Sequence, residues 1–261
     1  MIIQAILFGI VEGLTEFLPI SSTAHLILTH AILPLQSENS ETFMIAIQLG
    51  AILAVLIRYR RYFLAFVSPR QWLSRQTGVL LTAILPVLVA GLCFYKLIKA
   101  ALFSIHTIGI GLFVGALIMI WVQRRYRPET CTSVAIEQVT YRQALIIGCC
   151  QCASLWPGMS RSGSTIVGGL LAKLSYQTAA EFSFIIAVPV MICAVSYDLL
   201  SVFSLLTSTD IQLISLGFLV SFLMALVAMS TFLTLLSRWQ LTPFAFYRIG
   251  LALIIFFGPL T

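Results

Sequence analysis

The sequence predicts an all-α integral membrane protein, and three observations support that class. Hydrophobic residues make up 60% of the 261 residues and charged residues only 9%, whereas a soluble domain has roughly 25% charged residues. The mean hydropathy is +1.04. The apolar residues form long continuous runs, as membrane-spanning helices require, rather than the short alternating segments of a β-barrel.

Six of these apolar runs predict membrane-spanning helices. They are residues 42–57, 79–98, 101–122, 178–200, 211–236 and the shorter 243–260. The stretch 62–78 predicts an amphipathic connector on the cytoplasmic surface. Arginine clusters at 58–61 and 124–127 predict that these ends face the cytoplasm, because basic loops stay on that side. The basic loops also account for the net charge of +6, so the sequence gives no indication of a nucleic-acid partner.

Two other apolar runs are interrupted by polar residues. Residues 2–33 break at "LPISSTAH" and residues 140–174 break at "WPGMSRSGS", which leaves arms too short or too polar to span comfortably. Broken helices are tolerated at membrane depth only where protein or a water-filled cavity covers the freed backbone. We therefore predict two re-entrant helix–loop–helix hairpins.

The two halves of this single membrane domain, 1–261, resemble each other. At a constant offset of 139, Gln4, Ala5, Gly9 and Glu12 match Gln143, Ala144, Gly148 and Gln151. After a slip of one residue, Pro19 and Ser22 match Pro157 and Ser160. Each half, 1–122 and 140–261, would hold one hairpin followed by three spans. An odd number of spans makes such repeats inverted, with a shared site between them.

The first hairpin contains "EGLTEFLPISSTAH", residues 12–25. Glu12 and Glu16 lie four residues apart, on one helix face, and ionisable residues inside a membrane are functional candidates. Two close carboxylates can hold a divalent cation or share a proton. Ser21, Ser22 and Thr23 can cap the next helix. Alternatively, a serine with His25 within one turn is the outline of an activated nucleophile.

The second hairpin contains "PGMSRSGST", residues 157–165. Gly158 and Gly163 free the backbone at the start of a helix, where exposed N–H groups bind phosphate. Arg161 adds a charged fork suited to phosphate oxygens, or else it neutralises Glu12 or Glu16 across the interface. Hydroxyls surround it, from Ser160, Ser162, Ser164 and Thr165. Two polar residues elsewhere, Gln48 and Asp198, are further candidates to line a cavity.

Together these two motifs closely resemble the bacterial undecaprenyl-diphosphate phosphatase family of the bacitracin-resistance type. The resemblance extends to "TYRQA" (140–144), "AAEFSF" (179–184), "AVP" (187–189) and "PFAFYR" (243–248). It implies hydrolysis of undecaprenyl diphosphate to the monophosphate plus inorganic phosphate, which recycles the lipid carrier for cell-wall synthesis and confers bacitracin resistance. It also implies a divalent cation, Mg²⁺ or Ca²⁺, and a site in the bacterial cytoplasmic (inner) membrane that opens toward the outer side. Ala24 and Ser164 depart from the family's usual residues without removing a chemical group.

The residue patterns and the resemblance together give the expected site. The expected catalytic residues are Glu16, Ser22, His25 and Arg161, with Glu12 and Glu16 holding the metal. The expected substrate-binding residues are Glu12, Ser21, Thr23, Ser160, Ser162, Gly163 and Thr165. Ser22 and His25 both stay open as the nucleophile. The partners are a polyprenyl diphosphate and membrane lipid, and the oligomeric state stays open, a homodimer included. Transport of a lipid phosphate or small anion is the alternative function, since inverted repeats with broken helices also build transporters.

Overall fold

The structure, a computed structural model, describes residues 1–35, 39–66, 68–102, 104–202 and 205–258. These ranges form α-helices, three short 3₁₀ turns and no strand. The helices of the first half are α1 Ile2–Thr15, α2 Ser22–Ile32, α3 Ser40–Ala46, α4 Gln48–Arg58, α5 Arg60–Ala65, α6 Pro69–Trp72, α7 Arg75–Leu102 and α8 Ile105–Arg125. Those of the second half are α9 Tyr141–Gln151, α10 Arg161–Leu171, α11 Tyr176–Val202, α12 Ser208–Trp239 and α13 Thr242–Phe257.

Five segments of the described chain are long and apolar enough to cross a membrane. They are Ser40–Arg58, Arg75–Phe94, Ile105–Arg125, Tyr176–Leu200 and Ser208–Trp239. They coincide with five of the six predicted spans. The sixth, α13, is apolar but has 16 residues, and the last part of its predicted range lies outside the described residues. The surface connector is shorter than predicted, because α7 already begins at Arg75.

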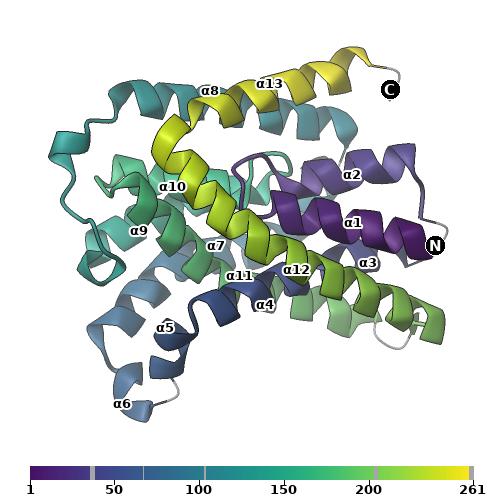
Figure 1. The fold of residues 1–261 in the computed structure, drawn as a ribbon, viewed down its shortest axis with the longest axis horizontal. Coiled ribbons are helices and arrows are strands. Elements are labelled where there is room, and N and C mark those ends of the chain that lie inside the picture. Colours follow the sequence, from purple (N-terminus) through teal and green to yellow (C-terminus); the bar gives the residue numbers. More distant parts are fainter. Residues whose placement is uncertain (36–38, 67, 103, 203–204, 259–261) are drawn as a thin grey trace.

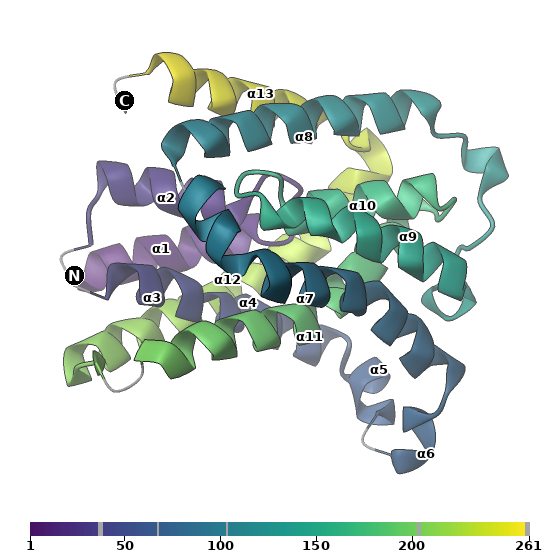
Figure 2. The same ribbon diagram turned by 180° about the vertical axis from the view of Figure 1, so that it is seen from behind.

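The two interrupted runs form the predicted pairs of short helices. The α1–α2 pair and the α9–α10 pair approach each other from opposite ends of the molecule, and their turns meet near its centre (Figures 1 and 2). Helix α12 crosses one face of this central layer and α7 crosses the other, while α8 and α13 run side by side along a third side. The two turns are thereby enclosed by long helices.

The long helices pack closely on the first arms of both pairs. Helix α1 lies along α12, and α9 lies along α7. At Gly13 of α1, a Cβ atom would lie 2.7 Å from the Cβ of Met224 and would collide with the Ser221 carbonyl of α12. Glycine therefore allows the backbones to come this close, and the close packing fixes the arm that carries Glu12 and Glu16.

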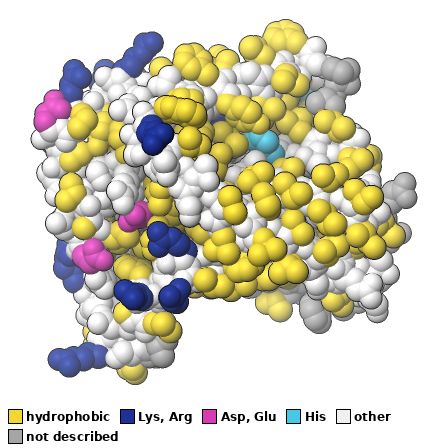
Figure 3. All heavy atoms as spheres, in the orientation of Figure 1, with side chains coloured by type: hydrophobic (Ala, Val, Ile, Leu, Met, Phe, Trp, Pro, Cys, Tyr) yellow, Lys and Arg dark blue, Asp and Glu magenta, His cyan; other side chains and the backbone are white. Residues whose placement is uncertain are grey.

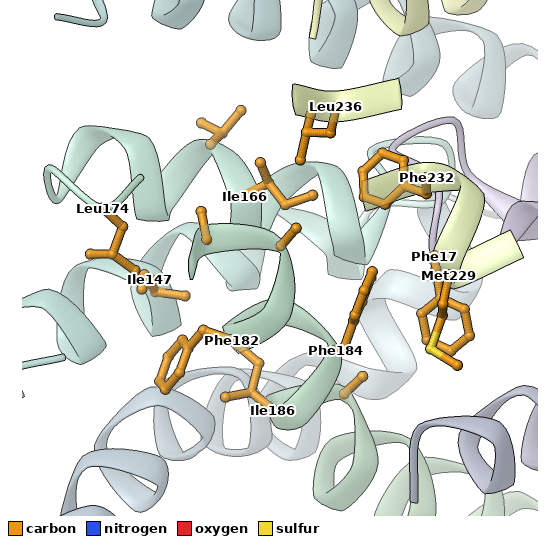
Figure 4. Close-up of a cluster of buried hydrophobic side chains, with 14 of the residues drawn as sticks. Phe17, Ile147, Ile166, Leu174, Phe182, Phe184, Ile186, Met229, Phe232 and Leu236 are labelled. Atoms are coloured by element: carbon orange, nitrogen blue, oxygen red, sulfur yellow. The ribbon is translucent and has the colours of Figure 1, made fainter. Parts of the chain in front are cut away.

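A hydrophobic core lies directly behind the two turns (Figure 4). Phe17, the residue after Glu16, packs edge-on against Phe184 with ring centroids 5.1 Å apart. Phe184 and Phe232 are also in contact, with centroids 6.1 Å apart. The edge-to-face pair of Phe17 and Phe184 stabilises beyond its buried area. The core therefore holds the first turn rigidly against α11 and α12.

Charged side chains gather at one end of the molecule. In the face shown in Figure 3, lysine, arginine and acidic residues lie at the end that carries α5, α6 and the last turn of α8, and most of the remaining face is hydrophobic. Arg58, Arg60, Arg61, Arg124 and Arg125 belong to the helices of this end and are all exposed. Such a division is typical of a protein embedded in a bilayer with one basic side.

Candidate active site

The second arms of both pairs begin in the same unusual backbone conformation. Ser21 has φ of 70° and Ser160 has φ of 71°, a region that residues with a Cβ rarely adopt. Each serine caps its helix: the Ser21 Oγ accepts the N–H of Ala24 at 3.4 Å, and the Ser160 Oγ accepts that of Gly163 at 3.1 Å. Capping therefore holds for these two hydroxyls, and it leaves Ser22 and Arg161 as the first residues of α2 and α10.

Glu16 links Ser22 and Arg161 across the interface between the two helix pairs. The Ser22 hydroxyl donates to Oε2 of Glu16 at 2.5 Å, and Nη2 of Arg161 donates to Oε1 at 2.7 Å. The contact between Arg161 and Glu16 is the only ion pair among the described residues. Both partners are largely buried, with side-chain exposures of 12% for Arg161 and 6% for Glu16. Charge-assisted hydrogen bonds in such surroundings are short and strong, so the three side chains form one fixed unit.

Arg161 is also held from its other side. Its Nη1 donates to the backbone oxygen of Ser183 at 3.0 Å and to the Ser183 hydroxyl at 3.3 Å. Its guanidinium lies 5.8 Å from the ring centroid of Phe17. The Nε–H of Arg161 is buried and has no partner among the described residues, so one donor of the guanidinium is unsatisfied. Ser183, in the motif "AAEFSF", is not among the expected site residues, although its place at the start of a predicted span left capping and function equally open.

A cavity of about 160 Å³ lies beside this unit. Residues from both turns and from the surrounding helices line it: Glu16, Ser21, Ser22, Thr23, Gln48, Ser154, Pro157, Gly158, Ser160, Arg161 and Met191. Six of the predicted site residues are among them, and so is Gln48. Glu12, His25, Ser162, Gly163, Thr165 and Asp198 are not among them. The cavity is small, polar and bounded by both motifs, as a phosphate-sized site would be.

The predicted contact between Ser22 and His25 is absent from the structure. The Nδ1 atom of His25 lies 2.7 Å from the Ser21 carbonyl, and Nε2 lies 2.7 Å from the Tyr247 hydroxyl, with the two rings stacked. A carbonyl only accepts, so Nδ1 carries the proton and Nε2 accepts from Tyr247. Both ring nitrogens are thereby occupied, and the partner of Ser22 is Glu16. Tyr247 was missed because it lies 222 residues away in the chain.

The other hydroxyls of the second motif mostly bond within the protein. Ser162 donates to the Leu18 carbonyl at 2.8 Å, which ties the two turns together. Thr165 bonds to the Ser183 hydroxyl at 2.6 Å and to carbonyls of its own helix. Gly163 supplies the N–H that Ser160 caps. These residues shape the turn that presents Arg161, whereas Ser164 has a buried hydroxyl with no partner in the described chain.

Arg248 of α13 is completely buried and holds both turns in place. Its five N–H donors reach five backbone carbonyls at 2.9–3.2 Å, those of Pro19, Gly111, Leu112, Gly158 and Met159. These acceptors belong to the first turn, to α8 and to the second turn. Arginine alone has five donors in a fixed fork. The sequence motif "PFAFYR" contains Arg248, but nothing in its local pattern indicated this contact.

The carboxylates fit a divalent cation in part. Glu12 is fully buried, neither of its oxygens has a hydrogen-bond partner among the described residues, and it interacts electrostatically with Glu16 and Arg161. An unpartnered buried carboxylate next to another is the hard oxygen donor set that Mg²⁺ and Ca²⁺ take. No cluster of three or more His, Cys, Asp or Glu occurs in the described ranges. A cation here would need further oxygens from water or from phosphate, as Mg²⁺ commonly does.

Comparisons with known proteins identify the family to which this chain belongs. The family described as "Bacitracin resistance protein BacA" matches residues 5–254. "Undecaprenyl-diphosphatase 1" of Bacillus thuringiensis subsp. konkukian (strain 97-27) is 46% identical over 257 residues, covering 97% of this chain and 96% of that protein. "Undecaprenyl-diphosphatase" of Maridesulfovibrio salexigens is 45% identical, and the protein of that name from Nitratidesulfovibrio vulgaris (strain DP4) is 44% identical, each covering at least 97% of both chains. This chain belongs to the BacA family.

Proposed function

We propose that this protein hydrolyses undecaprenyl diphosphate to undecaprenyl phosphate and inorganic phosphate in the bacterial inner membrane. The observation that carries the proposal is the unit of Ser22, Glu16 and Arg161. It combines a hydroxyl nucleophile, a carboxylate base and a phosphate-binding cation at one small cavity. Relatives at 43–46% identity over nearly the whole chain bear that activity in their names.

Arg161 binds the terminal phosphate in this mechanism. Its Nε–H is free, and its two other nitrogens are held by Glu16 and Ser183, so the guanidinium is already oriented when the substrate enters. Phosphoryl transfer depends mainly on positioning and on stabilising charge at the phosphoryl oxygens. A preoriented arginine does both without reorganising during the reaction.

Ser22 is the nucleophile that the geometry favours. Its hydroxyl already donates to Glu16, which takes the proton as the Oγ–P bond forms and the bond to the prenyl phosphate breaks. Water then attacks the phosphoserine, and Glu16 returns its proton to the Ser22 Oγ as the Oγ–P bond breaks. The oxygen and the two protons of the water leave on inorganic phosphate, as dihydrogen phosphate. In a variant of this scheme Ser22 orients the attacking water directly. His25 is the less suitable nucleophile, because both of its nitrogens are already bonded.

Glu12 and Glu16 would hold a divalent cation, which would neutralise phosphate charge when bound. Glu12 would contribute its two oxygens, which have no hydrogen-bond partner among the described residues. Glu16 would contribute while it remains bonded to Arg161 and Ser22.

We further propose six spans and two re-entrant pairs arranged as inverted repeats, with the site open to the outer side. The element bounds support the repeats: α10 begins and ends 139 positions after α2 (22 to 161, and 32 to 171). The same offset relates Ser21 to Ser160 without the slip that sequence matching had suggested. The basic end is the end from which α9 starts, which supports entry of the second pair from the cytoplasm and of the first from outside.

The direct test is phosphate release from undecaprenyl diphosphate by the purified protein in detergent with Mg²⁺, where transport cannot register. We expect turnover for the wild type and a loss of about a hundredfold or more for Arg161→Ala, since removing a preoriented phosphate ligand costs several kcal/mol of transition-state stabilisation. Wild-type protein without any release would instead favour the transport alternative.

Substitutions of Tyr247 and His25 should lower turnover less than substitutions in the unit of Ser22, Glu16 and Arg161. Tyr247→Phe removes one hydrogen bond, worth about 1 kcal/mol, and we expect kcat to fall roughly fivefold. His25→Ala also leaves the Ser21 carbonyl without its donor, so we expect it to lower kcat further than Tyr247→Phe does. Steady-state phosphate release measures both. If Tyr247→Phe were as damaging as Ser22→Ala, His25 would have to take part in proton transfer.

A further inference from the structure

A second, larger cavity lies at the basic end of the molecule, away from the candidate active site. It has a volume of about 720 Å³. Arg58, Arg60 and Arg61 line it together with Glu137, which gives these charged lining residues a net charge of +2. None of the three arginines has an ion pair among the described residues, and the guanidinium of Arg58 lies 5.4 Å from the centroid of the Tyr59 ring. Three guanidinium groups without a counter-ion around one cavity attract an anion.

A tyrosine hydroxyl adds an uncharged donor to this cavity. Tyr59 and Tyr62 both line it, but the Tyr59 hydroxyl is itself buried, so Tyr62 is the candidate donor. Burial, with a smaller effect of Glu137, raises the pKa of Tyr62 to about 12. Its hydroxyl therefore stays protonated at neutral pH and can donate to a phosphate oxygen.

The walls of the cavity connect it to the hydrocarbon layer. Ile57 lies in the last turn of the spanning segment Ser40–Arg58, and Leu226 lies in the spanning helix α12. Beside the cavity, α5 and α6 expose Leu64 and Trp72, at 64% and 63%, and Leu73 follows at 96%. Apolar side chains on short surface helices beside basic residues are typical of a segment lying in the membrane interface.

We propose that this cavity, lined by Arg58, Arg60 and Arg61, binds the headgroup of an anionic membrane phospholipid, with the acyl chains running along Ile57 and Leu226. A basic pocket between membrane helices at the basic side fits this ligand. The apolar walls favour a lipid over a soluble phosphate, because a free anion would gain nothing from them. The site is separate from the cavity at Glu16, so its occupancy does not depend on the proposed hydrolysis.

The test uses the full-length protein in nanodiscs of phosphatidylcholine with a trace of photoactivatable phosphatidylglycerol. A matched photoactivatable phosphatidylcholine serves as the neutral probe, and labelled peptides are mapped by mass spectrometry. We expect the anionic probe to label the segments around Ile57 and Leu226 about fivefold more than the neutral one, since each nearby arginine adds attraction for an anionic lipid. In the triple variant Arg58→Gln, Arg60→Gln, Arg61→Gln this preference should disappear, so that both probes label these segments to about the same extent.

The control variant removes the same charge from the same end of the molecule. Arg124→Gln, Arg125→Gln, Arg127→Gln changes exposed arginines outside the cavity and should keep the labelling preference. Equal loss in both triple variants, or no loss in either, would overturn the proposal. The proposal would also be overturned if millimolar inorganic phosphate protected these segments from labelling, because the ligand would then be a soluble anion. Phosphate release in detergent, expected at the wild-type rate for both variants, shows that they fold. If the first variant is inactive, Arg61→Gln replaces it in the same comparison.

Discussion

Replacing Glu16 with glutamine is expected to lower kcat for phosphate release by roughly a thousandfold, the range seen when a general base is lost. Glutamine still fits the space, but it cannot take the proton of Ser22, and it leaves Arg161 without its counter-ion in a largely buried setting. Ser22→Ala should cause a similar loss. The measurement is single-turnover phosphate release at saturating substrate, so that weaker binding is not mistaken for slower chemistry.

The double variant tests whether these residues act as one unit. Glu16→Gln with Ser22→Ala should be no slower than either single variant, because residues that act together are strongly non-additive. Glu181→Gln is the matched control. Glu181 accepts a hydrogen bond from Gln177 and lies outside the lining of the cavity, so its loss should leave kcat near the wild-type value. Near-normal turnover of Ser22→Ala, with an inactive His25→Ala, would reassign the nucleophile to His25.

Replacing Arg248 with methionine is expected to destabilise the fold by about 3–5 kcal/mol, the cost of removing one partner of a buried charged contact. Methionine fills much of the volume, but five buried carbonyls lose their donor at once. At about 2–4 °C per kcal/mol for a chain of this size, the midpoint of thermal unfolding in detergent should fall by about 6–20 °C.

Two further variants separate this contact from a general effect of charge. Arg248→Lys keeps the charge but has only three donors, so it should lie between wild type and Arg248→Met. Arg238→Met removes an exposed arginine at the end of α12 and should change stability by no more than about 0.5 kcal/mol. An Arg248→Met protein as stable as the control would mean that the turns do not depend on this residue.

The helical class and the position of both breaks followed from the sequence because they depend on local features. A run of apolar residues and a proline–serine interruption are visible along the chain, and α1–α2 and α9–α10 lie where the breaks predicted them. Pairing of Arg161 with Glu16 was foreseen as an alternative, since ionisable residues inside a membrane commonly pair with one another. Helix positions set by local features were therefore predictable to within a few residues.

The contacts that depend on the far end of the chain were not predictable. Tyr247 and Arg248 are neighbours in α13, yet one meets His25 and the other meets both turns. No spacing rule connects position 248 to positions 19 and 158, because only the packing of α13 beside α8 brings them together. The proposed Ser22–His25 pair failed to form for the same reason. Tyr247 offered His25 an alternative partner that the local sequence did not contain.

Ser22 and Arg161 occupy the same position in their respective helices, one residue after a capping serine with positive φ. If the halves descend from one duplicated segment, a single ancestral side chain has become two different ones, a neutral oxygen on one side and a permanent cation on the other. That divergence gives the cavity a polarity of its own. In the proposed mechanism, a diphosphate that enters between the two turns would meet unlike groups, which would favour one orientation over the other. The difference between the repeats would then select the terminal phosphorus for attack and leave the prenyl chain on the product that stays in the membrane.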